Sequence, residues 1–376
     1  MLIFAGLSLV LWVVLLFGRG GFWRADQRLG VPPAPEAWPE IAVVIPARNE
    51  VETIAEVVAA HRATAYPGAV RVFVVDDSSD DGTAEAAREA GAEVVAAPPL
   101  APGWTGKLWA VSSGVAAAEK AMPDLRWLLL TDADIVHAPE TLQRLVAMGE
   151  ARDLALVSLM ARLDARGFWG RLLIPAFIFF FQKLYPFRWV NDPQRMMGGA
   201  AGGCMLVRAE ALRGIGGIAA IRGALIDDCT LAARLKTGPP RRAIWLGLAD
   251  GEMVSRRDNR PLGSIWTMVA RSAFTQLDHS ALQLLGTVLG MVLIYLAPPL
   301  AVAVGLLSQP MLLVLGLAAW ALMLVAYRPT LRLYGLGAWH GLLLPLAGVL
   351  YTAMTVDSAL QHWRGQGGRW KGRTYP

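Results

Sequence analysis

A long apolar stretch near the C-terminus limits what this chain can fold into more than any other feature. No Asp, Glu, Lys or Arg occurs from Ala281 to Tyr327, and none occurs in residues 333–356 or 1–18. A helix needs about 20 apolar residues to cross a bilayer, so the first stretch predicts two spans and the chain about four. Hydrophobic residues make up 55% of the sequence and charged residues 17%, a balance typical of membrane proteins. We therefore predict an N-terminal transmembrane anchor over 1–18 and a C-terminal transmembrane region over 281–356.

Basic residues beside the apolar segments predict the orientation of the chain. Arg19, Arg24 and Arg28 follow the first segment, and the positive-inside rule places the region after them in the cytoplasm. That segment lacks a basic start and a small-residue cleavage site, which favours a retained anchor over a secretory signal peptide. Cys204 and Cys229 are too few for a framework of disulfides, which suits a reducing compartment.

The C-terminal tail conflicts with four spans. Four crossings would leave the tail, residues 357–376, outside the cell, yet it carries Arg364, Arg369, Lys371 and Arg373. Either one apolar segment is re-entrant or interfacial, or the number of spans is wrong by one. The net charge of +5 suits contact with anionic lipid, although basic flanks that only orient helices account for most of it.

The polar region over residues 38–277 predicts a folded cytoplasmic domain. Its first half alternates short β-rich runs with helical stretches. The expected strands cover 41–45, 70–75, 93–96 and 127–130, and the expected helices cover 51–65, 83–90 and 107–121. This alternation predicts an α/β fold with a mostly parallel central sheet covered on both faces. In such sheets, ligands bind at the carboxyl ends of the strands.

Acidic residues follow two of the expected strands. Asp76 and Asp77 come after one strand, and Asp132 and Asp134 come after another. The segment 46–50, Pro-Ala-Arg-Asn-Glu, follows the first strand. Because the carboxyl ends of parallel strands share one edge, we expect all of these residues at the same edge of the sheet.

The Asp132-Ala133-Asp134 triplet is a candidate metal site. Two carboxylates at the end of a buried strand suit Mg²⁺ or Mn²⁺, which takes oxygen ligands and keeps positions free for substrate phosphates. On its own, the same pattern is also typical of a solvated turn or a helix cap. Of the aspartates near residue 80, Asp80 and Asp81 are assigned to local turn structure.

Two glycine-rich segments are candidates for ligand contact. Lys107 lies in "GWTGKLWAVSSG" where a helix is expected to begin, a position that suits a phosphate. The segment "MMGGAAGGCMLVR" has glycines at 198, 199, 202 and 203, which let a backbone approach a ligand closely; a flexible loop is the alternative.

The pair Asp227-Asp228 opens an expected helix in "ALIDDCTLAARLK". An Asp at a helix start is most often a cap. A second Asp beside it, partly desolvated and next to a like charge, is instead a candidate general base.

The order of these segments resembles the family 2 glycosyltransferases, whose nucleotide-sugar-binding fold is called GT-A. The resemblance covers about residues 41–276 and lies in the whole series of motifs rather than in any one of them. It implies that the nucleotide is surrounded by Ala47, Arg48, Glu50, Asp76, Asp77 and Lys107. It also implies that Asp132 and Asp134 meet the ribose and the metal-diphosphate.

On the acceptor side, the resemblance implies that Asp228, next to Asp227, is the base that deprotonates the acceptor, and that Gly202 and Gly203 line this side. The processive and ceramide-type relatives carry Q-x-x-R-W after the base, whereas here only Arg271 of that motif is present. Arg271 can still pair with the diphosphate leaving group. The missing Trp argues against a processive synthase and for a single transfer.

The segments "FWRADQRLG", "PGWTGKLWAV" and "VARSAFTQL" resemble the hopene-associated glycosyltransferases of bacteria, and more distantly the ceramide glucosyltransferases. This implies a hopanoid or related lipid acceptor. The apolar segment 170–187 suits a helix lying at the membrane interface near that acceptor, and a buried core helix is the alternative.

Together these observations predict a metal-dependent, inverting hexosyltransferase of the bacterial inner membrane. It would be multi-pass, with its catalytic domain facing the cytoplasm. Its expected partners are a nucleotide-sugar donor, with a UDP-sugar first, a membrane lipid and the bilayer, and no nucleic acid. The alternatives are a polyprenyl-phosphate or ceramide/diacylglycerol sugar transferase, and a non-catalytic membrane scaffold with a GT-A-like fold.

Overall fold

The structure is a computed structural model that describes residues 1–367, 369–370 and 373–374, so part of the expected basic tail lies outside it. The strands are β1 Ile41–Ala47, β2 Val70–Asp76, β3 Glu93–Ala96, β4 Trp127–Thr131, β5 Ile135–His137, β6 Leu156–Met160, β7 Cys204–Arg208, β8 Ile244–Leu248, β9 Met253–Ser255, β10 Arg369–Trp370 and β11 Arg373–Thr374. The helices are α1 Leu2–Gly18, α2 Val51–Arg62, α3 Thr83–Glu89, α4 Gly106–Ala121, α5 Thr141–Ala151, α6 Gly167–Leu184, α7 Phe187–Val190, α8 Ala209–Gly214, α9 Asp227–Thr237, α10 Leu262–Ala270, α11 Ala281–Met291, α12 Ala297–Leu307, α13 Pro310–Leu333 and α14 Leu344–Trp363. Short helical turns are η1 Phe22–Arg24, η2 Ile218–Ile221, η3 Thr275–Leu277, the π-helical η4 Val292–Leu296, and η5 Ala338–Leu343.

A seven-stranded sheet forms the centre of the α/β part, in the order β3-β2-β1-β4-β7-β6-β8. All neighbours are parallel except at β7, which runs antiparallel to β4 and β6. The carboxyl ends of β1, β2 and β4 and the amino end of β7 therefore meet at one edge. A separate two-stranded ribbon joins β5 to β9. The expected α/β fold with a mostly parallel central sheet is confirmed.

Alternate residues of the strands pack into two cores, one on each face of the sheet. Val43 and Ile45 pack with residues of α2 and α5, including Ile54 and Leu145. Their neighbours Ala42 and Val44 pack with α4, in a core that continues into α6 and α13. Alternate residues of β1 thus connect one face of the sheet to α2 and α5, and the other face to α4, α6 and α13.

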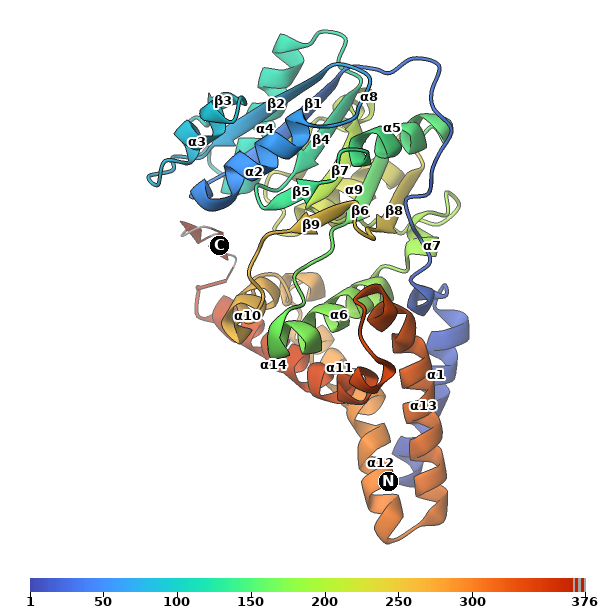
Figure 1. The fold of residues 1–376 in the computed structure, drawn as a ribbon. Coiled ribbons are helices and arrows are strands. Elements are labelled where there is room, and N and C mark those ends of the chain that lie inside the picture. Colours follow the sequence, from blue (N-terminus) through green and yellow to red (C-terminus); the bar gives the residue numbers. More distant parts are fainter. Residues whose placement is uncertain (368, 371–372, 375–376) are drawn as a thin grey trace.

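Below the sheet, α1, α12 and α13 extend away from the α/β part as a narrow bundle (Figure 1). Close approach of α12 to α13 depends on small residues, because a Cβ at Gly305 would lie 2.3 Å from the Leu313 nitrogen. Three helical segments are long and apolar enough to cross a membrane: 281–307, 310–333 and 338–363. Helix α1, with 17 residues, is shorter. Apolar side chains exposed on these helices include Ile3, Phe4, Val14, Phe17, Leu282, Leu289, Leu307, Met311, Val314 and Val325.

A π-helical turn interrupts the first of these segments between α11 and α12. Pro298 lacks a backbone N–H, so the carbonyl of Ile294 loses its helical donor. The indole N–H of Trp12 donates to that carbonyl at 2.9 Å, and the Trp12 ring packs edge-on against Tyr295. The break therefore provides one of the contacts between α1 and the C-terminal helices.

Helices α6, α10, α11 and α14 form a layer between the sheet and the narrow bundle (Figure 1). Three hydrogen bonds hold α14 in this layer. The Trp266 indole donates to Asp357 at 2.7 Å, the Ser358 hydroxyl accepts from the Phe274 amide at 3.0 Å, and the Tyr351 hydroxyl donates to the α6 backbone at 2.9 Å. Although α14 has the length and composition of a span, it packs along α6 and α10.

Candidate active site

The ends of β1 and β2 form the first part of the site. Ala47 pairs with Asp76, and the Asp77 amide donates to the Ala47 carbonyl at 2.9 Å. Arg48 follows β1 and forms an ion pair with Asp77 at 3.7 Å. Ala47 is fully buried, so its side chain does not reach the surface of the site. One carboxylate oxygen of Asp76, Oδ1, is buried without a hydrogen-bond partner among the described residues.

The turn after β2 is held by Asp81. Its carboxylate accepts the amide N–H groups of Val51 at 3.1 Å and Thr83 at 3.0 Å, at the starts of α2 and α3. The Thr83 hydroxyl accepts the Glu50 amide at 2.8 Å, which fixes the position where Glu50 lines the cleft. This geometry matches the local turn role expected of Asp81.

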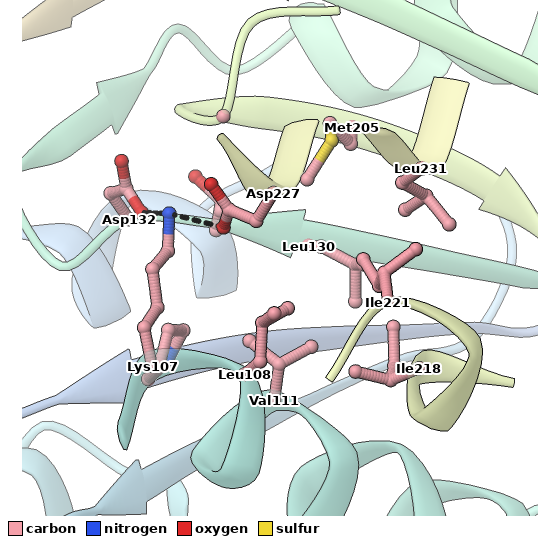
Figure 2. Close-up of a pocket in the computed structure, with 13 residues that line it drawn as sticks. Lys107, Leu108, Val111, Leu130, Asp132, Met205, Ile218, Ile221, Asp227 and Leu231 are labelled. Atoms are coloured by element: carbon pink, nitrogen blue, oxygen red, sulfur yellow. Dashed lines mark ion pairs between the residues drawn. The ribbon is translucent and has the colours of Figure 1, made fainter. Parts of the chain in front are cut away.

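Lys107 links the two acidic groups of the site. It lies in the first turn of α4, and its Nζ is 3.0 Å from both Asp132 Oδ1 and Asp227 Oδ2. Figure 2 shows this bridge, with apolar side chains such as Val111 and Ile221 forming the wall behind it. Burial alone would lower the pKa of Lys107, but the two carboxylates raise it above its usual value. Lys107 therefore stays charged across the physiological range.

Asp132 and Asp134 follow β4 and have different partners. Whereas Asp132 pairs with Lys107, the Asp134 carboxylate accepts the Ser255 hydroxyl at 3.1 Å, with Arg257 Nε 3.9 Å away. Burial raises the pKa of Asp134, and the charge of Asp132 raises it further. A bound cation would offset the repulsion between these two negative charges.

The donor set suits a metal that is completed by substrate. Among the described residues no group of three or more His, Cys, Asp or Glu side chains could hold an ion. Mg²⁺ and Mn²⁺ do not need such a group, since one or two carboxylates plus phosphates and water are enough. The Asp132/Asp134 pair fits this kind of site.

Asp228 lies at the start of α9 and is held by two backbone donors. Its Oδ2 accepts the Gly202 amide at 2.9 Å, and its Oδ1 accepts the Cys229 amide at 2.7 Å. Burial raises the pKa of Asp228 to about 6, and the neighbouring Asp227 adds to the rise. Each carboxylate oxygen has two lone pairs, so Asp228 can still accept a proton or another hydrogen bond.

The glycine-rich segment before β7 brings the sheet edge close to α9. A Cβ on Gly202 would lie 3.4 Å from both Asp228 Oδ2 and Lys107 Nζ. One on Gly203 would lie 3.2 Å from Ile135. Glycine at 202 therefore leaves room for the charged groups, and glycine at 203 leaves room for Ile135 of β5.

Gly198 gives a direct test of this packing. A Cβ at this position would lie 2.4 Å from the Cα of Ala233 in α9, so Gly198→Ala must move the helix that carries Asp227 and Asp228. We expect it to lower the stability by about 1–3 kcal/mol, seen as a lower melting temperature of the detergent-solubilised chain. Gly214→Ala is the control, because a Cβ there meets nothing within 4 Å. Equal melting temperatures for the two variants would contradict the close approach.

One cleft of about 710 Å³ brings most of the expected site residues together. Those that line it are Glu50, Lys107, Asp132, Asp134, Gly202, Gly203, Asp227, Asp228 and Arg271. Arg48, Asp76 and Asp77 lie at the adjoining strand ends rather than in its lining. The cleft also has apolar lining from the helical layer, including Phe177 and Phe181 of α6 and Met268 of α10.

Three residues in or beside the cleft were not expected from the sequence. Ser255 and Arg257 reach Asp134 from β9 and the segment after it. The Tyr185 hydroxyl donates to Gln276 at 2.8 Å, and burial together with Cys229 and Asp228 raises its pKa. The basic run "SRRDNR" was a usable signal for Arg257, whereas no pattern marks Tyr185.

Comparison with known proteins agrees with this fold. Residues 42–216 match the family model described as glycosyl transferase family 2. An N-acetylglucosaminyltransferase of Mesorhizobium japonicum is 32% identical over 143 residues, which are 36% of this chain and 31% of that protein. Glycosyltransferase AglJ of Haloferax volcanii is 43% identical over 63 residues, 17% of this chain and 19% of that protein. The chain thus spans about a third and a fifth of these two relatives.

A solved structure is similar over nearly the whole chain. It is the mannosyltransferase PcManGT from Pyrobaculum calidifontis in complex with GDP-Man and Mn²⁺. The TM-score is 0.50 at 18% identity, and the match covers 96% of this chain and 99% of that one. The similarity therefore includes the apolar helices as well as the α/β part.

Proposed function

We propose that this chain, which carries a family 2 glycosyltransferase domain over residues 42–216, is a membrane-bound, inverting glycosyltransferase. It moves one sugar from a nucleotide diphosphate sugar to a hydroxyl group of a membrane lipid. The observation that carries the proposal is the shared cleft, which is lined by Asp228, by the Asp132/Asp134 pair and by apolar side chains of α6 and α10. The carboxylates and the apolar side chains thus line the same cleft.

The donor occupies the side of the cleft formed by the ends of β1, β2 and β4. Asp76 supports a nucleobase contact, because its buried Oδ1 needs an N–H donor and a nucleobase supplies one. The same edge of the sheet also carries Arg48, Asp77 and Glu50. The full burial of Ala47 leaves it a role only in packing this edge.

The diphosphate lies against Asp132, Asp134 and Lys107. The two carboxylates would hold Mg²⁺ or Mn²⁺, which supplies positive charge to the diphosphate when bound. PcManGT is in complex with Mn²⁺, which supports the same choice of ion here. Lys107 adds a fixed positive charge, since Asp132 and Asp227 keep it protonated.

Transfer occurs by direct displacement with inversion at the anomeric carbon. The acceptor oxygen forms a bond to that carbon while the bond to the diphosphate oxygen breaks, and the hydroxyl proton passes to Asp228. The diphosphate leaves with the electron pair, and Arg271 in the cleft lining neutralises its growing charge. A pKa near 6 suits a base that must be free to accept a proton at neutral pH.

The acceptor approaches between α6 and α10. Phe177, Phe181 and Met268 give this side of the cleft an apolar surface. A lipid with a fused-ring hydrocarbon body and a terminal hydroxyl matches it, and the sequence resemblance points to a hopanoid. The chain then works in the bacterial inner membrane with its α/β part in the cytoplasm, where nucleotide sugars are made.

Lipid extracts test this function most directly. We expect a gene-deleted strain to lack one glycolipid that the complemented strain restores, and mass spectrometry then identifies both sugar and lipid. The purified full chain in lipid nanodiscs should make the same glycolipid from a UDP-sugar and the unglycosylated lipid. Identical lipid profiles in the two strains, together with a change in a water-soluble glycan, would contradict a lipid acceptor.

A further inference from the structure

A second cavity adjoins the catalytic cleft and has a different character. Its volume is about 460 Å³, and it lies between the segment after β6, the first turns of α6, the end of β9 and the turn after α13. Four arginines line it, Arg162, Arg166, Arg171 and Arg256, against one acid, Asp164. This excess of positive charge predicts an anionic ligand.

Two of the four arginines already have carboxylate partners. Arg166 donates twice to Asp164 at 2.9 Å, and Arg256 pairs with Glu56. Arg162 lies over the ring of Tyr334, 5.8 Å from its centre. Within the part of the chain that the structure describes, neither Arg162 nor Arg171 forms an ion pair. These two guanidinium groups are therefore available to an anion from outside the protein.

The start of α6 adds to the attraction. This helix of 18 residues begins at Gly167, beside Arg166, and within the described structure its first turn has neither a side-chain cap nor an acidic residue. The N–H groups of this first turn carry the positive end of the helix dipole. The cavity thus combines two unpaired guanidinium groups with an uncapped helix start.

The cavity lies at the level where lipid headgroups are expected. Its Tyr334–Leu336 wall directly follows Leu333, the last residue of a helix long enough to cross the membrane. Nearby, Phe168 in the first turn of α6 is 61% exposed and Trp339 after α13 is 62% exposed. Exposed aromatic side chains of this kind concentrate at the boundary between hydrocarbon and headgroups.

We propose that this cavity binds the phosphate of an anionic phospholipid from the surrounding bilayer. Arg162 and Arg171 donate to the phosphate oxygens, and the acyl chains run down beside α6 and α13. The cavity shares Leu163 and Ser255 with the catalytic cleft, and Ser255 bonds to Asp134. A phospholipid bound in the cavity would therefore restrict the movement of the segment around Ser255, which positions Asp134. Binding itself does not depend on the reaction proposed above.

Native mass spectrometry of the full chain in neutral detergent tests this proposal. The probes are phosphatidylglycerol and phosphatidylcholine with the same acyl chains. We expect one phosphatidylglycerol to be retained more tightly than phosphatidylcholine. The double variant Arg162→Gln/Arg171→Gln should weaken that binding by about tenfold or more, because each charge-assisted hydrogen bond contributes more than a neutral one.

The control is Arg88→Gln/Arg213→Gln, which removes the same charge from α3 and α8, away from the helical layer. It should bind phosphatidylglycerol as the wild type does. If the double variant melts early, the exposed Arg171→Gln alone carries the test and should lose part of the affinity. Equal retention of the two lipids, or wild-type affinity in the cavity variants, would overturn the proposal.

Soluble anions separate a lipid from a free phosphate. Inorganic phosphate and glycerol phosphate, added at the concentration at which phosphatidylglycerol saturates the chain, should fail to displace the lipid. Displacement at equal concentration would assign the cavity to a soluble phosphate compound and overturn the lipid assignment.

Discussion

Replacing Asp228 with asparagine is expected to lower kcat by about 10²–10⁴-fold while donor binding stays close to that of the wild type. A carboxamide cannot take the proton of the acceptor hydroxyl. It can still accept one of the two N–H bonds that Gly202 and Cys229 now donate, so α9 should keep its position. The measurement is single-turnover transfer in nanodiscs, with calorimetric titration of the donor alongside.

The pH dependence of the transfer activity provides a second test with the same variant. Because burial raises the pKa of Asp228 to about 6, the wild type should lose activity as the pH falls through that value and the base becomes protonated. The residual activity of Asp228→Asn should lack this fall. Asp124→Asn, at an exposed aspartate outside the cleft, is the matched control and should behave as the wild type. Near-normal activity of Asp228→Asn would favour an acceptor that needs no base, such as a polyprenyl phosphate.

Asp134→Ala should remove metal-dependent donor binding. The substitution leaves Asp132 as the single carboxylate of the pair, and Asp132 already bonds to Lys107. Loss of partners outside the first ligand shell costs about 10–100-fold in metal affinity, so loss of a ligand should cost on the order of 100-fold or more. Calorimetric titration of a UDP-sugar with and without Mn²⁺ measures the difference.

The control for this experiment is Asp124→Ala, which makes the same chemical change at an exposed site. It should keep the full effect of Mn²⁺ on donor affinity. If the wild type binds the donor equally well with and without metal, or if Asp134→Ala keeps the metal effect, the assignment of this carboxylate pair fails. The first of these results would also favour a non-catalytic scaffold.

The first half of the α/β part was predictable because its signals are local. Most expected strands there are short apolar runs followed by polar turn residues, and β1 to β4 match the expected runs to within two residues at either end. Helix α2 ends at Arg62 rather than near residue 65. Once the strands were predicted, the position of the aspartates at one edge of the sheet could be predicted as well.

The second half depends on contacts between distant residues, which no local pattern reveals. Strand β7 enters the sheet antiparallel between β4 and β6, and β9 lies outside the sheet altogether. The bond from Ser255 to Asp134 therefore joins residues 121 positions apart. Likewise, the hydropathy of α14 predicts a membrane-spanning helix. Its hydrogen bonds to α6, α10 and the turn after α10 instead hold it in the helical layer.

The position of α14 has a consequence for how the chain is threaded through the bilayer. With α14 packed in the helical layer, α1, α12 and α13 remain as the segments that run the length of the bundle (Figure 1). We infer an odd number of crossings, which leaves the two ends of the polypeptide on opposite faces of the membrane. Arg364 would then lie on the same side of the membrane as Arg19, which is the arrangement that the positive-inside rule favours.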